Sequence, residues 1–187
     1  MLALLGALKE EIAGLRRQMI VDEAFAGQGY RIYRGKYHGK DVLLAQTGMG
    51  KENAERATEF ILKQYQVTIL ICLGYSGALV KELEAGDIAL CAILHSDDER
   101  SPESSRIQNP VYSDDDLVSM AVETQKVDGL TGFHKVSSVT TANLITEPKD
   151  KLALGRAFHA EVVDMESYWV AAMASVRRIP FLSVRAI

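Results

Sequence analysis

The run VTILICLG at residues 67–74 decides the fold class, because its residues are apolar almost without interruption. A strand exposed on one face alternates apolar and polar residues, whereas a strand covered on both faces reads as a continuous apolar run. The run DIALCAIL at 87–94 has the same character. Both patterns predict strands of a parallel or mixed sheet that lies between helices.

The rest of the chain alternates short apolar runs with longer amphipathic ones. We expect strands at 2–7, 67–74, 87–94, 129–142, 160–165 and 179–187, and a hairpin at 30–48 with its turn at YHGK. We expect helices at 9–19, 51–65, 114 to about 126, 147–158 and 166–178. The polar segment 95–116, with two of the four prolines, is expected to be a long loop. Strands and helices that alternate in this way predict one three-layer α/β domain.

Length and composition fit a single soluble domain. The chain has 187 residues, enough to bury most of its apolar surface in one core. Its formal net charge of −4 predicts no binding to nucleic acid or to an anionic membrane. No apolar run is long enough to span a bilayer, and the N-terminus MLALLGALKEE lacks the basic leader of a signal peptide. These features predict a cytoplasmic protein.

The cysteines and the acidic run give no sign of a metal site. Cys72 and Cys91 each lie inside an apolar run, without a CxxC pair or metal-ligand spacing, and are expected to be reduced, buried thiols. His95 stands beside the acidic run 97–99. Consecutive acidic residues in a proline-bearing loop are usually solvated, so we expect no metal there.

Two glycines mark a strand-to-helix junction in QTGMGKENA (46–54). Backbone amides at such a junction point into one cavity, and the helix dipole adds partial positive charge, so anions or hydroxyls can bind there. The P-loop pattern fails at Ala45 and Glu52, and the dinucleotide fingerprint fails at Asn53. An ordinary tight turn explains the stretch as well as a binding site does.

A second pair of glycines follows the strand at 67–74, in CLGYSGALVKELEAGDI (72–88). Glycines at the carboxyl end of a strand let a ligand approach the backbone closely, where open α/β sheets tend to bind ligands. A turn without a ligand is equally compatible with this stretch.

Carboxylates open two of the expected helices. Glu10 and Glu11 in LGALKEE are explained by the helix dipole alone. Asp164 and Glu166 in VVDMESYWV also stand at a helix start, but Met165 and its neighbours make the surroundings apolar. A carboxylate in such surroundings needs a partner, and vicinal sugar hydroxyls are good ones. The second stretch therefore predicts a sugar-binding site.

Together these motifs resemble the nucleoside phosphorylase and nucleosidase superfamily, and within it the 5'-methylthioadenosine/S-adenosylhomocysteine nucleosidase branch. The resemblance runs in order through LLGALKEEI, TGMGKENA, GYSGAL, EAGDI, VVDMES and FLSVRAI. It implies a three-layer α/β/α fold with a mixed, partly barrel-like sheet. It further implies hydrolysis of the N-glycosidic bond of a 5'-substituted adenosine, without metal or organic cofactor, by a homodimer whose second chain lends part of the 5' pocket.

The resemblance also implies roles for single residues. Glu11 would activate the attacking water, Met165 would pack on the ribose, and Glu166 would accept hydrogen bonds from the 2' and 3' hydroxyls. Leu8 and Met49 would face the 5' side. The residues implied to line the pocket near C1' are Thr47, Gly48, Gly74, Tyr75, Ser76 and Gly77, and the segment from Ser138 to Ala142 would border the purine. Carboxylates suit this chemistry, because positive charge develops on the ribose as the bond breaks.

Three departures from the family pattern keep alternatives open. The family protonates the leaving purine with an aspartate in VRAISD, two residues beyond Ile187, so we expect this chain to lack that acid and the C-terminal helix. A non-catalytic nucleoside-binding protein is therefore an alternative. Leu73 replaces a phosphate-binding arginine of the phosphorylases and Glu11 would repel phosphate, which favours hydrolysis over phosphorolysis. Tyr75 and Ser76 replace Ser or Thr followed by Ala, so the 5' group of the futalosine or adenosyl-hopane branch is a further alternative.

Overall fold

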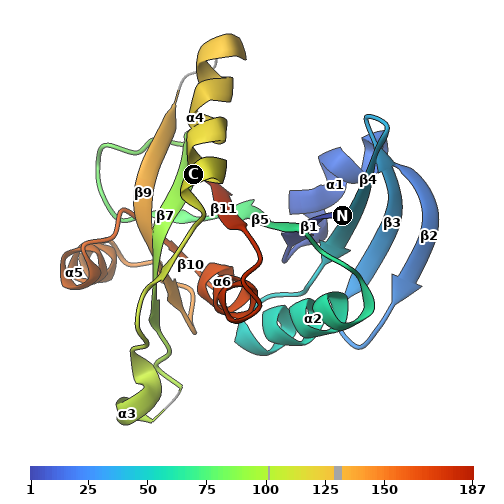
Figure 1. The fold of residues 1–187 in the computed structure, drawn as a ribbon. Coiled ribbons are helices and arrows are strands. Elements are labelled where there is room, and N and C mark those ends of the chain that lie inside the picture. Colours follow the sequence, from blue (N-terminus) through green and yellow to red (C-terminus); the bar gives the residue numbers. More distant parts are fainter. Residues whose placement is uncertain (101, 129–131) are drawn as a thin grey trace.

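The computed structural model describes residues 1–100, 102–128 and 132–187, and a single mixed sheet runs through them (Figure 1). In spatial order its strands are β2 (Ile20–Ala26), β3 (Arg31–Tyr37), β4 (Lys40–Gln46), β1 (Leu2–Gly6), β5 (Ile69–Tyr75), β11 (Phe181–Ala186), β7 (Ile88–Asp97), β9 (Phe133–Thr141), β10 (Val162–Asp164) and β6 (Gly77–Ala78), and β8 (Val111–Tyr112) pairs with β7. The pairs β1–β4, β1–β5, β5–β11, β7–β9 and β9–β10 are parallel. The remaining pairs are antiparallel.

The sheet curls back on itself. β6 begins only two residues after the end of β5, yet it pairs with β10 at the far end of the strand order. The β10–β6 edge must therefore return to the carboxyl end of β5, and Figure 1 shows the curved path of the strands. The expected mixed, partly barrel-like sheet is confirmed. This curl brings the ends of β1, β5 and β10 close to one another.

Helices cover both faces of the sheet (Figure 1). On one face α2 (Lys51–Gln64) packs against α6 (Ser167–Val176). On the other face lie α1 (Lys9–Gln18) and α4 (Asp115–Asp128), and α5 (Pro148–Phe158) lies beside β9 and β10. Alternate side chains of β1 point to opposite faces of the sheet. Leu5 belongs to the same core cluster as Ile61 of α2, whereas Leu4 packs with Ile12 of α1. Burial on both faces explains why such strands read as continuous apolar runs.

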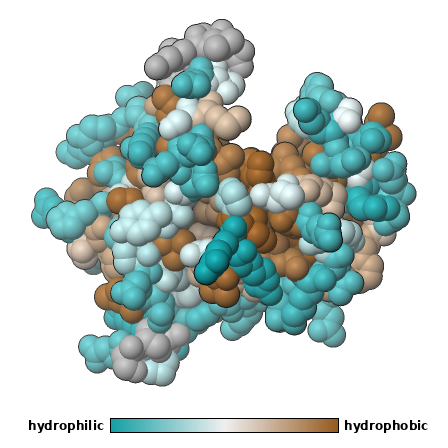
Figure 2. Space-filling view, in the orientation of Figure 1, coloured by the Kyte–Doolittle hydropathy of each residue, from teal (hydrophilic) through white to brown (hydrophobic). Residues whose placement is uncertain are grey.

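The two faces are covered unequally. Between α1 and α4, the side chains of Ile71 and Leu73 on β5 and Val184 on β11 are only partly buried. Figure 2 shows apolar surface in the hollow that separates these two helices, with polar surface around it. The α2–α6 face holds most of the large buried side chains of the main core.

Most of the predicted helices and strands are confirmed to within a few residues, but two segments differ. β2 was not predicted, because nearly all of its residues are exposed and give no apolar pattern. The segment 95–116 is not one loop, since β7 continues through Asp97 and both α3 (Glu103–Arg106) and β8 lie within it. The expected strand at 129–142 begins at Phe133, and 129–131 lie outside the described residues.

Two residues of the acidic run 97–99 are buried, contrary to the expectation that the run is solvated, whereas Glu99 is exposed. Asp97 and Asp98 are both 4% exposed, because Asp97 pairs with Arg106 and Asp98 pairs with Lys51. In the part of the chain that the structure describes, no group of three or more His, Cys, Asp or Glu side chains could hold a metal ion. The two acidic residues therefore fasten the end of β7 to its neighbours.

Cys72 and Cys91 are buried and unpaired, as expected. Burial raises the pKa of each thiol to about 12, so both stay protonated at neutral pH. Within the described residues, no helix has the length and apolar character needed to cross a membrane.

Candidate active site

A cavity of about 470 Å³ lies where the curled sheet brings strand ends together. Its walls come from five parts of the chain: the β1–α1 junction, the turn after β4, the turn after β5, the segment after β9 with the start of α5, and the β10–α6 junction. The carboxylates of Glu11 and Glu166 both belong to its lining. Two acidic residues far apart in the sequence thus line the same open cavity.

Two backbone N–H groups hold the Glu11 carboxylate. Oε2 accepts the N–H of Leu8 at 2.7 Å, and Oε1 accepts the N–H of Tyr75 at 3.0 Å. The first contact belongs to the opening turn of α1, where a carboxylate satisfies an otherwise unpaired N–H. The second contact ties the carboxylate to the end of β5. Glu11 is therefore oriented by two elements that are not adjacent in the sequence.

Gly74 lets the side chains of Glu11 and Arg185 approach the backbone of β5 closely on this side of the cavity. A Cβ at Gly74 would lie 2.6 Å from Glu11 Oε1 and 2.0 Å from Arg185 Nη1. Neither approach is possible with a side chain, so only glycine lets the carboxylate and the guanidinium pack against this stretch of β5.

Glu166 is held in a more buried place, at the start of α6. Its Oε1 accepts the N–H of Gly50 at 2.8 Å, and the residue is 7% exposed. Burial raises the pKa of Glu166 to about 7, the negative charge of Asp164 adds to the rise, and the Gly50 hydrogen bond opposes it. A ligand that donates hydrogen bonds to this carboxylate would favour its ionised form.

This shift gives a pH dependence of stability. The pKa of Glu166 is about 7 in the fold against the ordinary 4.5, so its contribution is complete below about pH 4.5 and is lost as the pH rises through 7. The free energy of unfolding should fall by up to about 3 kcal/mol between pH 5 and 8. Glu166→Gln should remove most of this slope in urea titrations at each pH. An unchanged slope in the variant would contradict the assignment.

Asp164 is used differently from Glu166. Its Oδ1 accepts hydrogen bonds from Thr140 Oγ1 at 2.7 Å and from the N–H groups of Glu166 and Ser167, each at 3.1 Å. Its Oδ2 lies 3.0 Å from Arg185 Nε, as an ion pair without hydrogen-bond alignment. Although Asp164 borders the cavity, its oxygens are occupied within the protein. Within the fold its partners are Thr140, Arg185 and two backbone N–H groups, and a sugar partner for Asp164 stays a prediction.

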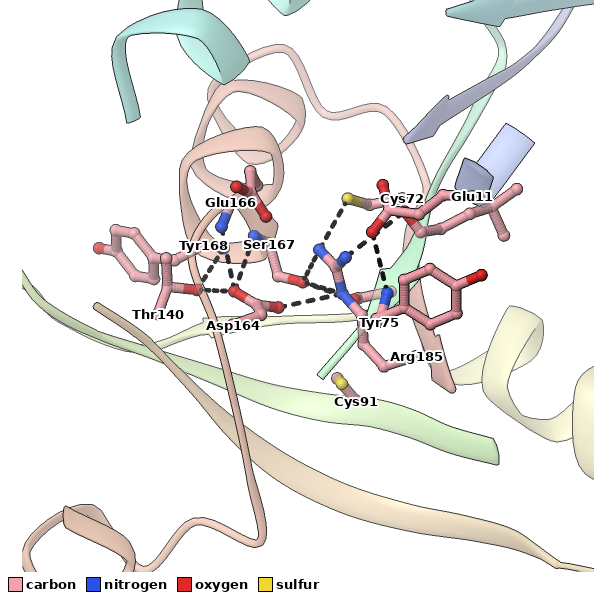
Figure 3. A network of polar contacts seen from close by, with 12 residues as sticks. Glu11, Cys72, Tyr75, Cys91, Thr140, Asp164, Glu166, Ser167, Tyr168 and Arg185 are labelled. Carbon is pink, nitrogen blue, oxygen red and sulfur yellow. Dashed lines mark hydrogen bonds and ion pairs between the residues drawn. The ribbon is translucent and has the colours of Figure 1, made fainter. Parts of the chain in front are cut away.

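Arg185 is the polar residue that the sequence analysis missed. Its side chain is 1% exposed, and it donates from Nε and Nη2 to Ser167 Oγ at 2.9 and 2.6 Å (Figure 3). Nη2 also reaches Cys72 Sγ at 3.2 Å, and Nη1 reaches the Leu73 carbonyl at 3.4 Å. Burial would lower the pKa of the guanidinium, but the negative charge of Asp164 raises it above its ordinary value. The available signal was a lone arginine inside the apolar run FLSVRAI.

The structure gathers most of the predicted site residues around this one cavity. Those that line it are Leu8, Glu11, Met49, Tyr75, Ser76, Gly77, Met165 and Glu166. The other three lie behind it: Thr47 and Gly48 donate their N–H groups to the carbonyls of Gly6 and Ala7, and Gly74 lies beneath Glu11. These three hold the β1 and β5 ends in place.

The segment expected to border a purine, Ser138 to Ala142, reaches the cavity only in part. Ser138 is buried within β9, and the lining begins only at Thr141. It continues through 143–146 and Lys151 of α5, which the sequence analysis did not single out. Since Leu144 is 76% exposed, this wall forms part of the rim of the cavity.

The chain is similar to proteins of known name over its whole length. Residues 1–187 match the family model described as the phosphorylase superfamily. A 5'-methylthioadenosine/S-adenosylhomocysteine nucleosidase of Staphylococcus haemolyticus is 26% identical over 195 residues, which cover 100% of this chain and 85% of that protein. A crystal structure of the nucleosidase of the same name from Neisseria meningitidis, in complex with methylthio-immucillin-A, matches with a TM-score of 0.90 at 23% identity and covers 99% of this chain and 84% of that one.

A second solved structure carries a different name. The native structure of futalosine hydrolase from Helicobacter pylori strain 26695 matches with a TM-score of 0.89 at 23% identity, and the match covers 100% of this chain and 83% of that one. At such identities the two structures show that the fold is shared.

Proposed function

The chain belongs to the phosphorylase superfamily, and we propose that it hydrolyses the N-glycosidic bond of a 5'-substituted adenosine and releases adenine. The observation that carries this proposal is the presence of Glu11 and Glu166 on one cavity of about 470 Å³. That volume suits a small-molecule ligand. Relatives named 5'-methylthioadenosine/S-adenosylhomocysteine nucleosidase support the same substrate class.

The proposed reaction uses three side chains of the lining. Met165 packs on the ribose, and Glu166 accepts hydrogen bonds from its 2' and 3' hydroxyls, which need an ionised carboxylate. Glu11 takes a proton from the attacking water, and its two backbone donors keep it oriented while it does so. As the water oxygen bonds to the anomeric carbon, the bond to adenine breaks and the leaving nitrogen takes up a proton from solvent. Negative charge on both residues stabilises the positive charge that develops on the ribose.

Water is the proposed nucleophile rather than phosphate. Among the described residues that line the cavity, Lys151 is the single cation, and three carboxylates stand against it. Arg185 is occupied by Asp164 and Ser167 and is not part of the lining. A phosphate dianion would therefore enter an electrostatically unfavourable place. We expect the rate of adenine release to be the same with and without added phosphate; a rate that depends on phosphate would establish phosphorolysis instead.

The direct test follows adenine release from 5'-methylthioadenosine by the full-length gene product, with a coupled oxidase and ultraviolet absorbance. We expect turnover without added metal or cofactor. Absence of adenine would overturn the enzymatic proposal. If calorimetry then detected micromolar nucleoside binding, the alternative of a non-catalytic binding protein would take its place.

A neighbouring cavity favours a second candidate, a nucleoside with a larger, polar 5' group. This cavity of about 390 Å³ shares Met49 and Met165 with the first, and Lys51, Asp98 and Arg100 also line it. Methionine side chains are flexible, so a long 5' group could pass between the two. We expect S-adenosylhomocysteine, whose tail carries both charges, to bind more tightly than 5'-methylthioadenosine.

The variant Arg100→Ala should remove that difference, because it deletes the cation best placed to meet a carboxylate. Calorimetry with the two nucleosides measures both affinities, and Lys63→Ala on the exposed surface of α2 is the control. Equal loss of affinity for both nucleosides would count against a charged 5' subsite.

We further propose that the protein acts as a homodimer in the cytoplasm. Met49, Tyr75 and Leu144 are 57%, 56% and 76% exposed on the cavity rim, and a second copy that covers this rim would complete the 5' pocket. The protonated thiols of Cys72 and Cys91 suit a reducing compartment. Sedimentation equilibrium should give twice the chain mass, and a monomer at micromolar concentration would refute the dimer.

A further inference from the structure

We propose that Arg185 is a positioning residue that fixes the two carboxylates, Glu11 and Glu166, relative to each other across the cavity. Arg185 does not line the cavity, so it acts through other groups rather than on a ligand. The inference rests on the proposed function, because it concerns the residues to which that function assigns the chemistry. Figure 3 shows the guanidinium between the elements that carry them.

One arm of the guanidinium reaches the Glu11 side. Nη1 donates to the carbonyl of Leu73 and packs against the bare backbone of Gly74. The next N–H along the chain, that of Tyr75, orients the Glu11 carboxylate at 3.0 Å. The end of β5 that positions Glu11 therefore rests directly on Arg185.

The other arm reaches the Glu166 side. Nε faces Asp164 Oδ2 at 3.0 Å, and Nε and Nη2 donate to Ser167 Oγ. Asp164 Oδ1 in turn accepts the backbone N–H of Glu166. The first turn of α6, which carries Glu166 into the cavity, is thus fixed to the same guanidinium.

The cost of this arrangement argues for a role beyond stability. The side chains of Arg185 and Asp164 are each 1% exposed, and apolar residues often replace such buried ion pairs without loss of stability. Cys72 and Cys91 of the apolar core stand on the neighbouring strands, and the hydroxyls of Thr140 and Ser167 are the polar side chains that contact the pair. The guanidinium is planar and has donors in fixed directions, so it can contact the end of β5 and the start of α6 at the same time. A lysine ammonium could not contact both at once.

The first test is Arg185→Lys. A lysine keeps the positive charge for Asp164 but cannot also hold the Leu73 carbonyl, so Glu11 loses its fixed place while Glu166 keeps its own. We expect kcat for adenine release to fall about 100-fold, with Kd for 5'-methylthioadenosine unchanged to within about 3-fold. Arg177→Lys, at the exposed end of α6, is the matched control. Equal loss of kcat and affinity, or no loss of kcat, would overturn the inference.

The second test is Asp164→Asn, which also serves if Arg185→Lys does not fold. Asparagine can still accept the three hydrogen bonds of Oδ1 but lacks the charge that pairs with Arg185. The charged groups around Glu166 are Asp164 of β10, Arg185 of β11 and Glu11 of α1. Removal of the Asp164 charge should lower the midpoint pH of nucleoside binding. A change in the melting temperature of the variant should not by itself account for this shift. An unmoved midpoint would overturn the coupling.

The two proposals fail in different ways. A wild-type protein that releases no adenine would refute the proposed function, and the inference would then be decided by the binding midpoint of Asp164→Asn. A wild-type protein that turns over normally, with an Arg185→Lys variant that does the same, would refute the inference and leave the proposed function intact.

Discussion

Glu11→Gln is expected to lower kcat for adenine release by about 10²–10⁴-fold, the usual contribution of a general base. Glutamine has nearly the same shape and keeps the cavity lined, but it cannot take a proton from water. It has a single acceptor oxygen for the N–H groups of Leu8 and Tyr75, so one of them loses its partner. Nucleoside affinity should change little, because the ribose hydroxyls are assigned to Glu166.

Steady-state kinetics and calorimetry on the same preparation check this result. Glu10→Gln is the matched control, because Glu10 stands in the same helical turn but is exposed and outside the cavity lining. A Glu11→Gln variant that loses rate and affinity in equal proportion would count against a role as the base that activates water.

Arg185→Met is expected to cause the largest loss of stability of any single substitution considered. It leaves the Asp164 carboxylate buried without its cation, and breaking a buried ion pair in this way costs about 3–5 kcal/mol. That is a large part of the roughly 5–15 kcal/mol that stabilises a typical domain. Urea titration measures the free energy of unfolding directly.

A surface pair provides the control for this prediction. Arg34 pairs with Glu23, and their side chains are 45% and 62% exposed, so Arg34→Met should cost less than about 1 kcal/mol. The double variant Arg185→Met/Asp164→Leu should recover part of the loss, since no charge then remains unpaired. If Arg185→Met lowered the free energy of unfolding by no more than Arg34→Met does, the stabilising role of the buried pair would be contradicted.

The sheet was predictable where burial leaves a pattern in the sequence. The apolar runs at 67–74 and 87–94 mark β5 and β7, since both faces of these strands are covered. β2 gave no such mark because its side chains are exposed. β7 was predicted to end too early, because Asp97 is buried by its partner Arg106 rather than by an apolar character of its own. Pairing between distant residues is invisible to periodicity.

The residues of the site were predictable from the sequence, but the contacts between them were not. The family motifs picked out Glu11 and Glu166, which the curled sheet brings to one cavity. The residue pattern alone could not separate Asp164 from Glu166, since both stand beside Met165 at a helix start; only the family resemblance assigned the ribose to Glu166. Their difference comes from Arg185 on β11, which is separated from β10 in the sheet by β7 and β9 and which pairs with Asp164.

The most direct test of the account is a crystal structure of the protein with a bound 5'-methylthioadenosine analogue that resists cleavage. We predict both ribose hydroxyls within hydrogen-bond distance of Glu166, roughly 2.6–3.2 Å, and a water between Glu11 and the anomeric carbon. A nucleoside bound elsewhere, or a ribose that touches neither carboxylate, would contradict it.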